Sequence, residues 1–443
     1  MTPNELIELM NDKKFKIIHE KIAQLNDVDL ALLLSELDDE HLALCFRMIE
    51  KRKAADVFAE FDNDLKAELI KSFTKQEIKS IIENMYADDA VDFLEDMPAN
   101  VVTQLLENVK GDTRATINKL LQYHDDSSGS IMTTEYIELL STMTVGDALK
   151  KIRQTGLNSE TVYTCYVTEK RKLLGIVSAK KLLISSDDVN IVDIMNTNYV
   201  YTKTSDDKEV VGNLFRKYGL IAIPVIDSEG CIVGIVTFDD AIDVLTAETT
   251  EDMQLMAAIS KNDEPYLKTS VFNHAKHRIL WLLILMFSAT ITGSIISKYE
   301  NAIVIIPLLV SFIPMLMDTG GNCGSQSSTL IIRGIAIDEI HFKDFFKVLW
   351  KEFRISLLVG FALAAANGAR ILLQYRDLKL AIVVSCSLML TIIISKIVGG
   401  ILPILAKKCH LDPAIMAAPI ITTIVDTFSI IIYFAIATMV FAL

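Results

Sequence analysis

The chain has 443 residues, of which 51% are hydrophobic, and a formal net charge of −14 at neutral pH. Residues 1–270 hold 29 Lys or Arg against 48 Asp or Glu, whereas the remainder holds 14 against 9. This acidic first part argues against a nucleic-acid partner, for which a basic stripe is expected, and it suits either cations or a merely solvated surface. The six cysteines lack CxxC spacing, which excludes the usual zinc patterns and indicates a reducing compartment.

Residues 1–125 contain short apolar segments, such as KQEIKSIIENM and DDAVDFLEDM, that follow one another at regular intervals. Each segment opens with capping or acidic residues and continues with helical periodicity. The pattern predicts a small solenoid of stacked helices. Its densest acidic cluster includes Asp88 and Asp92. These acids either complement the dipole of a helix or bind cations. No apolar signal peptide precedes this region, so we expect a cytoplasmic amino terminus.

Residues 126–250 contain a duplication, in which Gly175 of the first copy corresponds to Gly234 of the second, 59 residues later. Each copy alternates amphipathic helices with short strands rich in β-branched residues, such as TCYVT and AIPVI. The region resembles a tandem pair of CBS domains, whose signature is a strand ending Gly-Ile-Val-Ser/Thr before an acidic helix start. The resemblance implies an α/β fold.

In CBS pairs, a Thr-x-x-Asp sequence can hold the ribose and phosphate of an adenine nucleotide. Thr237 and Asp240 keep this pattern in the second copy, whereas the first copy has Ser178 and Lys181. The resemblance therefore implies that ATP can bind at one of the two sites.

The next segment bridges to an apolar region. Glu248, Glu251 and Asp252 lie close together on a predicted helix, and Pro265 can begin a new one. We expect residues 251–278 to form a connecting helix, which is either a mechanical linkage to the membrane or a rigid spacer.

Residues 279–443 predict an α-helical membrane domain with five spans. An amphipathic cytoplasmic helix is expected at 341–350, leading into the third span. Basic residues flank the predicted cytoplasmic side more often than the opposite side, which predicts an external carboxyl terminus. The expected spans are 279–297, 302–332, 355–369, 380–406 and 413–443.

The second span contains the sequence PMLMDTGGNCGSQ, in which Asp318 precedes a glycine cluster that includes Gly321 and Gly324. Such a cluster is poor helix material, and open backbone at membrane depth must line a cavity or lie buried in protein. Carbonyl groups there, with the Asn322 and Gln326 side chains, offer oxygen ligands for a cation. The alternative is close helix packing through small residues.

Asp426 is the one charged residue in the last span. A carboxylate in hydrocarbon costs roughly 2.5–3.5 kcal/mol, so it usually faces a water-filled path or a bound cation. Thr422 and Thr423 add hydroxyl oxygens on nearly the same helical face. The alternative is that Asp426 pairs with Lys396, the one Lys or Arg within a predicted span.

The order of helical solenoid, CBS pair, connecting helix and five spans, with the motifs GGNCGSQ and TTIVD, resembles the MgtE family of magnesium channels. The resemblance covers essentially the whole chain. It implies a homodimer in a bacterial-type plasma membrane, with Asp426 at an ion-selective constriction formed by the second and fifth spans. It also implies that cytoplasmic Mg²⁺ closes the pore by binding to acidic residues, which map onto Asp88, Asp92, Asp240, Asp243, Glu248, Glu251 and Asp252.

Two other functions remain open at this point. One is a CBS-regulated secondary transporter for another divalent cation or an organic anion, although an anion needs a cationic group, and Lys396 is the one candidate. The other is a membrane-tethered nucleotide sensor without transport, which leaves Asp426 and the glycine cluster unexplained. The sequence shows no nucleophile–base set and no P-loop, so we do not expect an enzyme.

Overall fold

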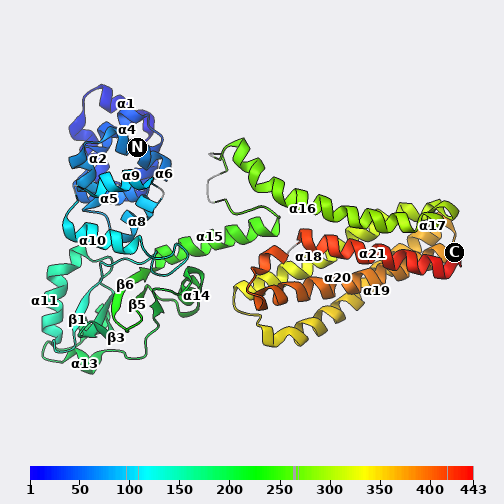
Figure 1. The fold of residues 1–443 in the computed structure, drawn as a ribbon. Helices are drawn as coiled ribbons and strands as arrows, with labels where there is room; N and C mark the ends of the chain where they lie inside the picture. The colour runs from blue at the N-terminus through cyan, green and yellow to red at the C-terminus, as the bar shows by residue number, and fades with distance from the viewer. Residues whose placement is uncertain (96, 108, 263–265, 268, 417, 443) are drawn as a thin grey trace. The chain divides into compact units, whose positions relative to one another are not determined.

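The computed structural model describes residues 1–95, 97–107, 109–262, 266–267, 269–416 and 418–442. It divides into two compact units, Met1–Leu245 and Thr246–Leu443 (Figure 1).

The first unit begins with a stack of short helices, which confirms the predicted solenoid. Polar side chains cap many of them, as where Asn26 accepts the backbone N–H of Asp29 at 2.7 Å. Such a cap contributes about 1 kcal/mol. Buried rings of Phe46, Phe58 and Phe93 join the helices into one core. The helices are α1 (Pro3–Asn11), α2 (Phe15–Gln24), α3 (Asp27–Ser35), α4 (Asp39–Phe46), α5 (Lys51–Ala59), α6 (Asn63–Ser72), α7 (Lys75–Ile82), α8 (Ala87–Glu95), α9 (Ala99–Leu106) and α10 (Gly111–Leu120).

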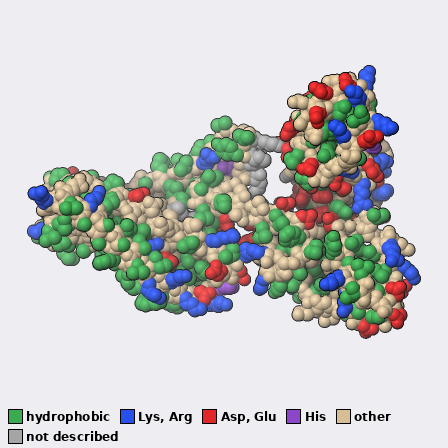
Figure 2. Space-filling model, turned by 180° about the vertical axis from the view of Figure 1, so that it is seen from behind, with side chains coloured by type: hydrophobic (Ala, Val, Ile, Leu, Met, Phe, Trp, Pro, Cys, Tyr) green, Lys and Arg blue, Asp and Glu red, His purple; other side chains and the backbone are tan. Residues whose placement is uncertain are grey.

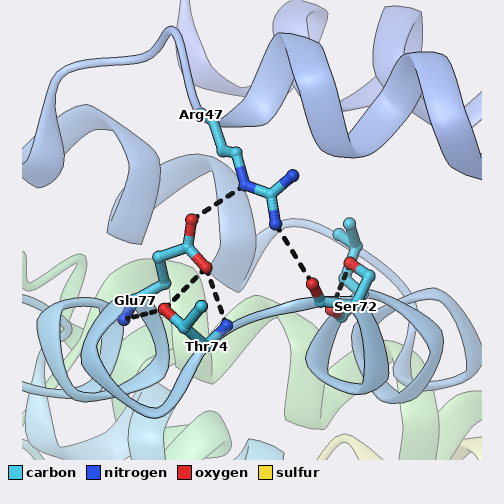
Figure 3. A network of polar contacts seen from close by, with 5 residues as sticks. Arg47, Ser72, Thr74 and Glu77 are labelled. Carbon is cyan, nitrogen blue, oxygen red and sulfur yellow. Dashed lines mark hydrogen bonds and ion pairs between the residues drawn. The ribbon is translucent and has the colours of Figure 1, made fainter.

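A polar network ties the end of α4 to the start of α7 (Figure 3). Arg47 donates to Glu77 Oε1 at 2.8 Å and to the carbonyl of Ser72 at 3.1 Å. The other carboxylate oxygen of Glu77 accepts the backbone N–H of Thr74 at 2.7 Å and its hydroxyl at 2.9 Å. Both oxygens of Glu77 therefore have donors within the protein.

Two three-stranded sheets follow, with strand orders β1-β2-β3 and β4-β5-β6, and each combines a parallel with an antiparallel pair. The register shifts at the same place in both, beside Gly175 in one and Gly234 in the other, which agrees with the predicted duplication. The elements are β1 (Glu138–Leu140), α11 (Val145–Thr155), β2 (Thr164–Glu169), β3 (Lys172–Ser178), α12 (Ala179–Ile184), α13 (Ile191–Ile194), β4 (Thr202–Lys203), α14 (Lys208–Tyr218), β5 (Ala222–Ile226) and β6 (Ile232–Thr237).

The two copies exchange the segments that precede their strands. Thr133, from the start of the first copy, bridges to Ile235 in β6, and Asn196, from the second copy, bridges to Ile176 in β3. A Cβ atom on Gly234 would lie 2.7 Å from the Thr133 carbonyl, so only glycine permits this approach. The sequence boundaries of the copies are therefore not boundaries of independent folding.

Helix α15 (Phe238–Met256) continues from β6 across the boundary between the units. It carries Asp240 and Asp243 near its start and Glu251 near its end. Helix α16 (Val271–Lys298) begins after the Ser270 cap, so residues 251–278 are not one helix. The predicted helix start at Pro265 lies outside the described residues.

In the second unit, four described helical segments are long and apolar enough to cross a membrane: Val271–Lys298, Phe342–Tyr375, Leu378–Lys408 and Pro413–Phe441. On the face shown in Figure 2, many hydrophobic side chains of this unit are exposed. The predicted second span comprises α17 (Glu300–Ile305), a 3₁₀ turn (Pro307–Phe312) and α18 (Ile313–Ala336). It is not among these four segments, so the count of five spans stays a prediction.

The expected amphipathic helix at 341–350 leads directly into the third span, and the resulting helix extends beyond the expected span of 355–369 at both ends. A 3₁₀ turn (Phe342–Asp344) leads into one continuous helix, α19 (Phe345–Tyr375). The remaining helices are α20 (Leu378–Lys408) and α21 (Ala418–Phe441), and α18, α19, α20 and α21 form a bundle around a shared apolar core.

Candidate functional site

Helix α18 separates its polar and its small residues onto two faces. Asp318, Asn322 and Gln326 are exposed and follow one another at four-residue intervals, so they form one stripe. Gly321 and Gly324 are buried. The expected open backbone at the glycine cluster is wrong, because the helix is continuous from Ile313 to Ala336.

The glycines of α18 allow α21 to approach closely. A Cβ atom on Gly321 would lie 2.8 Å from Thr422 Cγ2, and one on Gly324 would lie 2.5 Å from Ile421 Cγ2. The alternative of close helix packing through small residues therefore describes this segment. The carbonyl groups of the glycine cluster lie within a helix and not in an open loop.

Asp426 is half-buried on α21, and its carboxylate lies close enough to that of Asp318 for the two to repel each other. One turn earlier, the Thr422 and Thr423 hydroxyls donate to the Pro419 carbonyl at 2.9 and 3.0 Å. These hydroxyl oxygens keep lone pairs, so carboxylates and hydroxyls form an oxygen-rich strip where α18 meets α21.

The alternative interpretation, in which Asp426 pairs with Lys396, is wrong. Lys396 Nζ instead donates to the Ser327 hydroxyl at 3.3 Å and to the Cys323 carbonyl at 3.5 Å. Asp426 makes no ion pair with any described Lys, Arg or His.

In the first unit, acids from distant parts of the sequence converge around Asp88, which opens α8. Asp88 is 8% exposed, and its Oδ1 has no hydrogen-bond partner. Burial, with the nearby carboxylates of Asp240 and Asp89, raises its pKa well above the usual range. A buried carboxylate with this environment is unfavourable unless a proton or a cation neutralises it.

Glu160, which the sequence analysis did not identify, belongs to the same cluster. Burial, with the charges of Asp239, Asp89 and Asp240, raises its pKa to about 8, and its Oε2 is also without a hydrogen-bond partner. Glu160 lies in a loop, where neither helical nor strand periodicity indicates which side chains are buried, so the sequence pattern does not single it out. The acidic crevice, as we call it, comprises Asp88, Asp89, Glu160, Asp239 and Asp240.

Burial raises the pKa of Asp240 to about 7, although a hydrogen bond from the Thr237 hydroxyl lowers it. The Thr237–Asp240 pair predicted for a nucleotide thus exists, with its carboxylate beside the other acids of the crevice. Burial and Asp92 raise the pKa of Asp89 to about 6, while Asp243 borders the cluster next to Asp239. Figure 2 shows Asp and Glu side chains gathered between the helical stack and the CBS pair.

The acidic crevice fits a hydrated divalent cation better than a dehydrated one. No three His, Cys, Asp or Glu side chains converge closely enough to hold a metal ion among the residues described. Mg²⁺ binds oxygen ligands and keeps several of its waters, which can span the remaining distances to carboxylates. The orphan oxygens of Asp88 and Glu160 are suitable acceptors for such waters.

In the second unit, the last half of α15 carries Glu248, Glu251 and Asp252, and the first and last of these lie one turn apart. Glu251 pairs with Lys261 at 2.7 Å. It also raises the pKa of Asp412, although burial of Asp412 has the larger effect.

The end of α15 also contacts α18 and the 3₁₀ turn (Pro413–Met416) that precedes α21. Leu255 and Met256 pack against Ile332 of α18 and Ala414, which precedes α21. These side chains therefore contact the helix that carries Asp318 and the turn that precedes the helix carrying Asp426.

Family models match three parts of the chain. Residues 313–436 match the divalent cation transporter family MgtE, and residues 25–126 match the MgtE intracellular N domain. Residues 129–187 and 191–247 each match the CBS domain.

Magnesium transporters named MgtE are similar over most of their length. The protein of Thermus thermophilus is 35% identical over 74% of this chain and 73% of its own. The protein of Bacillus subtilis is 34% identical over 75% of this chain and 73% of its own.

Two solved structures resemble the first part of the chain. The soluble part of a magnesium transporter covers 56% of this chain and 97% of its own, at 27% identity and a TM-score of 0.53. The cytosolic domain of the Mg²⁺ channel MgtE in complex with ATP covers 55% and 99%, at 31% identity and a TM-score of 0.52.

Proposed function

The chain belongs to the MgtE family of magnesium transporters, and we propose that it is a Mg²⁺-selective channel of the plasma membrane. In this proposal the amino terminus is cytoplasmic and the carboxyl terminus external. The observation that carries the proposal is the strip of carboxylates and hydroxyls where α18 meets α21, with Asp426 half-buried within an otherwise uncharged helix.

One Asp426 per chain cannot surround an ion. A two-fold dimer would supply a second carboxylate and form a ring from the same residue of both subunits. Mg²⁺ sheds its hydration shell reluctantly, so a ring of few carboxylates assisted by the Thr422 and Thr423 hydroxyls would contact its waters. Asp318 and Asn322 of α18 would extend this oxygen lining.

Asp426→Asn tests the pathway, because it keeps the shape of the side chain and removes its charge. We expect Mg²⁺ uptake into proteoliposomes to fall at least about tenfold, the effect of roughly 1.4 kcal/mol. Glu300→Gln, which removes an exposed acid at the start of α17, is the matched control and should keep wild-type uptake. Wild-type uptake by the Asp426→Asn protein would contradict the proposed pathway.

We further propose that cytoplasmic Mg²⁺ closes the channel. Without a cation the acids of the crevice repel one another, and with a bridging cation they attract, so binding favours a compact state. Helix α15 would transmit this change, because Asp240 and Asp243 lie at its start, and Leu255 and Met256 at its end contact Ile332 of α18 and Ala414 just before α21. Glu248, Glu251 and Asp252 would bind further ions along it.

ATP is proposed as a modulator at the CBS pair, since the similar cytosolic domain was solved with ATP. Thr237 and Asp240 would contact the ribose and phosphate. Asp240 would then serve both the nucleotide and the acidic crevice. Titration calorimetry of ATP binding, with and without Mg²⁺, tests whether the two ligands influence each other.

A further inference from the structure

Three polar side chains meet inside the helical bundle of the second unit, at a place that the proposed ion pathway does not use. Lys396 comes from α20, Glu352 from α19 and Ser327 from α18. Their exposed fractions are 5%, 6% and 2%. Two charges so deeply buried in a membrane protein are costly unless each neutralises the other.

The hydrogen bonds run from Lys396 to Ser327 and from Ser327 to Glu352. Ser327 Oγ lies 2.6 Å from Glu352 Oε2 and 3.4 Å from the Cys323 carbonyl, so its single proton goes to the carboxylate. Its lone pairs can then accept a hydrogen bond from Lys396 Nζ at 3.3 Å. The serine therefore links the ammonium to the carboxylate, the arrangement expected when both are ionised.

The surrounding backbone is shaped to allow this link. A Cβ atom on Gly399 would clash with the carbonyl oxygen of Gly324, so α20 and α18 touch through their main chains. A Cβ atom on Gly400 would lie 3.1 Å from Glu352 Cγ. The two glycines follow Lys396 by about one helical turn, and they bring α18 and α19 within reach of its side chain.

We propose that Lys396 is an internal cation for Glu352, and that this pair, joined through Ser327, positions α18 for ion conduction. The link holds the buried face of α18 against α19 and α20, and the opposite face carries Asp318, Asn322 and Gln326. Lys396 and Glu352 are positioning residues, because neither lies in the oxygen-rich strip. The conduction part of this inference rests on the proposed function.

The test is a double-mutant cycle on the full chain, with Lys396→Met, Glu352→Gln and both together. Lys351→Met, which removes an exposed lysine beside Glu352, is the matched control. Thermal unfolding in detergent and Mg²⁺ uptake per folded protein are measured for each variant, with the ratio of Mg²⁺ to Co²⁺ uptake.

Each single variant leaves one buried charge without its partner. We expect at least a tenfold loss of uptake, a changed Mg²⁺ to Co²⁺ ratio and a lower unfolding temperature. The double variant, which buries no charge here, should recover uptake to within threefold of wild type, and Lys396→Arg should keep both uptake and ratio.

Three results would overturn the proposal. The first is wild-type behaviour of both single variants, and the second is a double variant no better than the worse single one. The third is a loss of unfolding temperature alone, with uptake per folded protein and the ion ratio unchanged, since that describes a purely structural pair. If the wild-type protein and the Lys351→Met control carry no Mg²⁺, the proposed function fails, while the unfolding temperatures still report on the pair.

Discussion

Glu77 and the acids of the acidic crevice, all in the first unit, differ in the hydrogen-bond donors that the protein places beside their carboxylates. Glu77 has Arg47 on one oxygen and Thr74 on the other, and the Arg47 hydrogen bond lowers its pKa to about 2. Asp88 and Glu160 each keep an oxygen without a partner, and burial raises the pKa of both. Both oxygens of Glu77 therefore have donors within the chain, whereas a proton or a cation from solution is needed to neutralise the buried carboxylates of the acidic crevice.

The largest difference between Glu77 and the acidic crevice is expected in the response to Mg²⁺, when Asp88→Asn is combined with Asp240→Asn. In the wild-type protein, Mg²⁺ at about 100 times its dissociation constant stabilises the folded state by roughly 2.7 kcal/mol per ion. The double variant should lose most of this stabilisation and need at least about tenfold more internal Mg²⁺ to close. Thermal unfolding and uptake against internal Mg²⁺ measure the two effects.

Glu77→Gln is the control for this double variant, because it removes an acid that is already satisfied. It should keep the wild-type response to Mg²⁺. An unaltered Mg²⁺ response in the double variant would mean that the acidic crevice is only a solvated surface.

A smaller effect is expected from pH in the absence of divalent ions. The pKa values of Glu160, Asp240 and Asp89 are raised to about 8, 7 and 6 in the folded protein. A raised pKa means that the folded state holds protons that the unfolded state has released. The stability from these protons is therefore complete below pH ~4 and is lost as pH rises toward 8.

Lowering pH from 8 to 6 with chelator present should thus stabilise the first unit by about 1–3 kcal/mol. With saturating Mg²⁺ the trend should weaken or reverse, because protons compete with the cation for the carboxylates. Chemical unfolding at three pH values, with and without Mg²⁺, measures both trends. Greater stability at pH 8 than at pH 6 without Mg²⁺ would contradict the raised pKa values.

The smallest effect is expected from Glu77→Gln on stability alone. Its carboxylate is about one-third exposed, so solvent screens the ion pair, and we expect a loss of about 1 kcal/mol at pH 7. Because the pKa of Glu77 is lowered, its contribution is present above pH ~4.5 and disappears as pH falls toward 2. A loss that instead grows with acidification in denaturant titrations would show that the network does not hold an ionised Glu77.

The sequence predicts what depends on local pattern. Helical periodicity marks the solenoid, the repeated glycine marks the CBS pair, and the isolation of Asp426 marks the candidate pathway. Asp88 and Asp240 were also identified, although the resemblance rather than any spacing linked them. What the sequence does not show is which acids share one buried space, so Glu160 was missed.

The continuous α18 and the length of α19, the two points at which the membrane unit differs from the predicted elements, have a common physical cause. Glycine disfavours helices in water, yet α18 stays helical through its glycine cluster because backbone groups among apolar helices need internal hydrogen bonds. Likewise, α19 continues through charged residues that a hydropathy count takes as a boundary, since the ends of a span can lie among polar groups.

The exchange between the CBS copies bears on how this part of the chain arose. Thr133 of the first copy completes the second sheet, and Asn196 of the second completes the first. A single ancestral copy could have made the same bridges only by trading these segments with another molecule. Gene duplication would then have fused an obligate dimer into one polypeptide, and separating the copies at residue 190 should yield two insoluble fragments rather than two small domains.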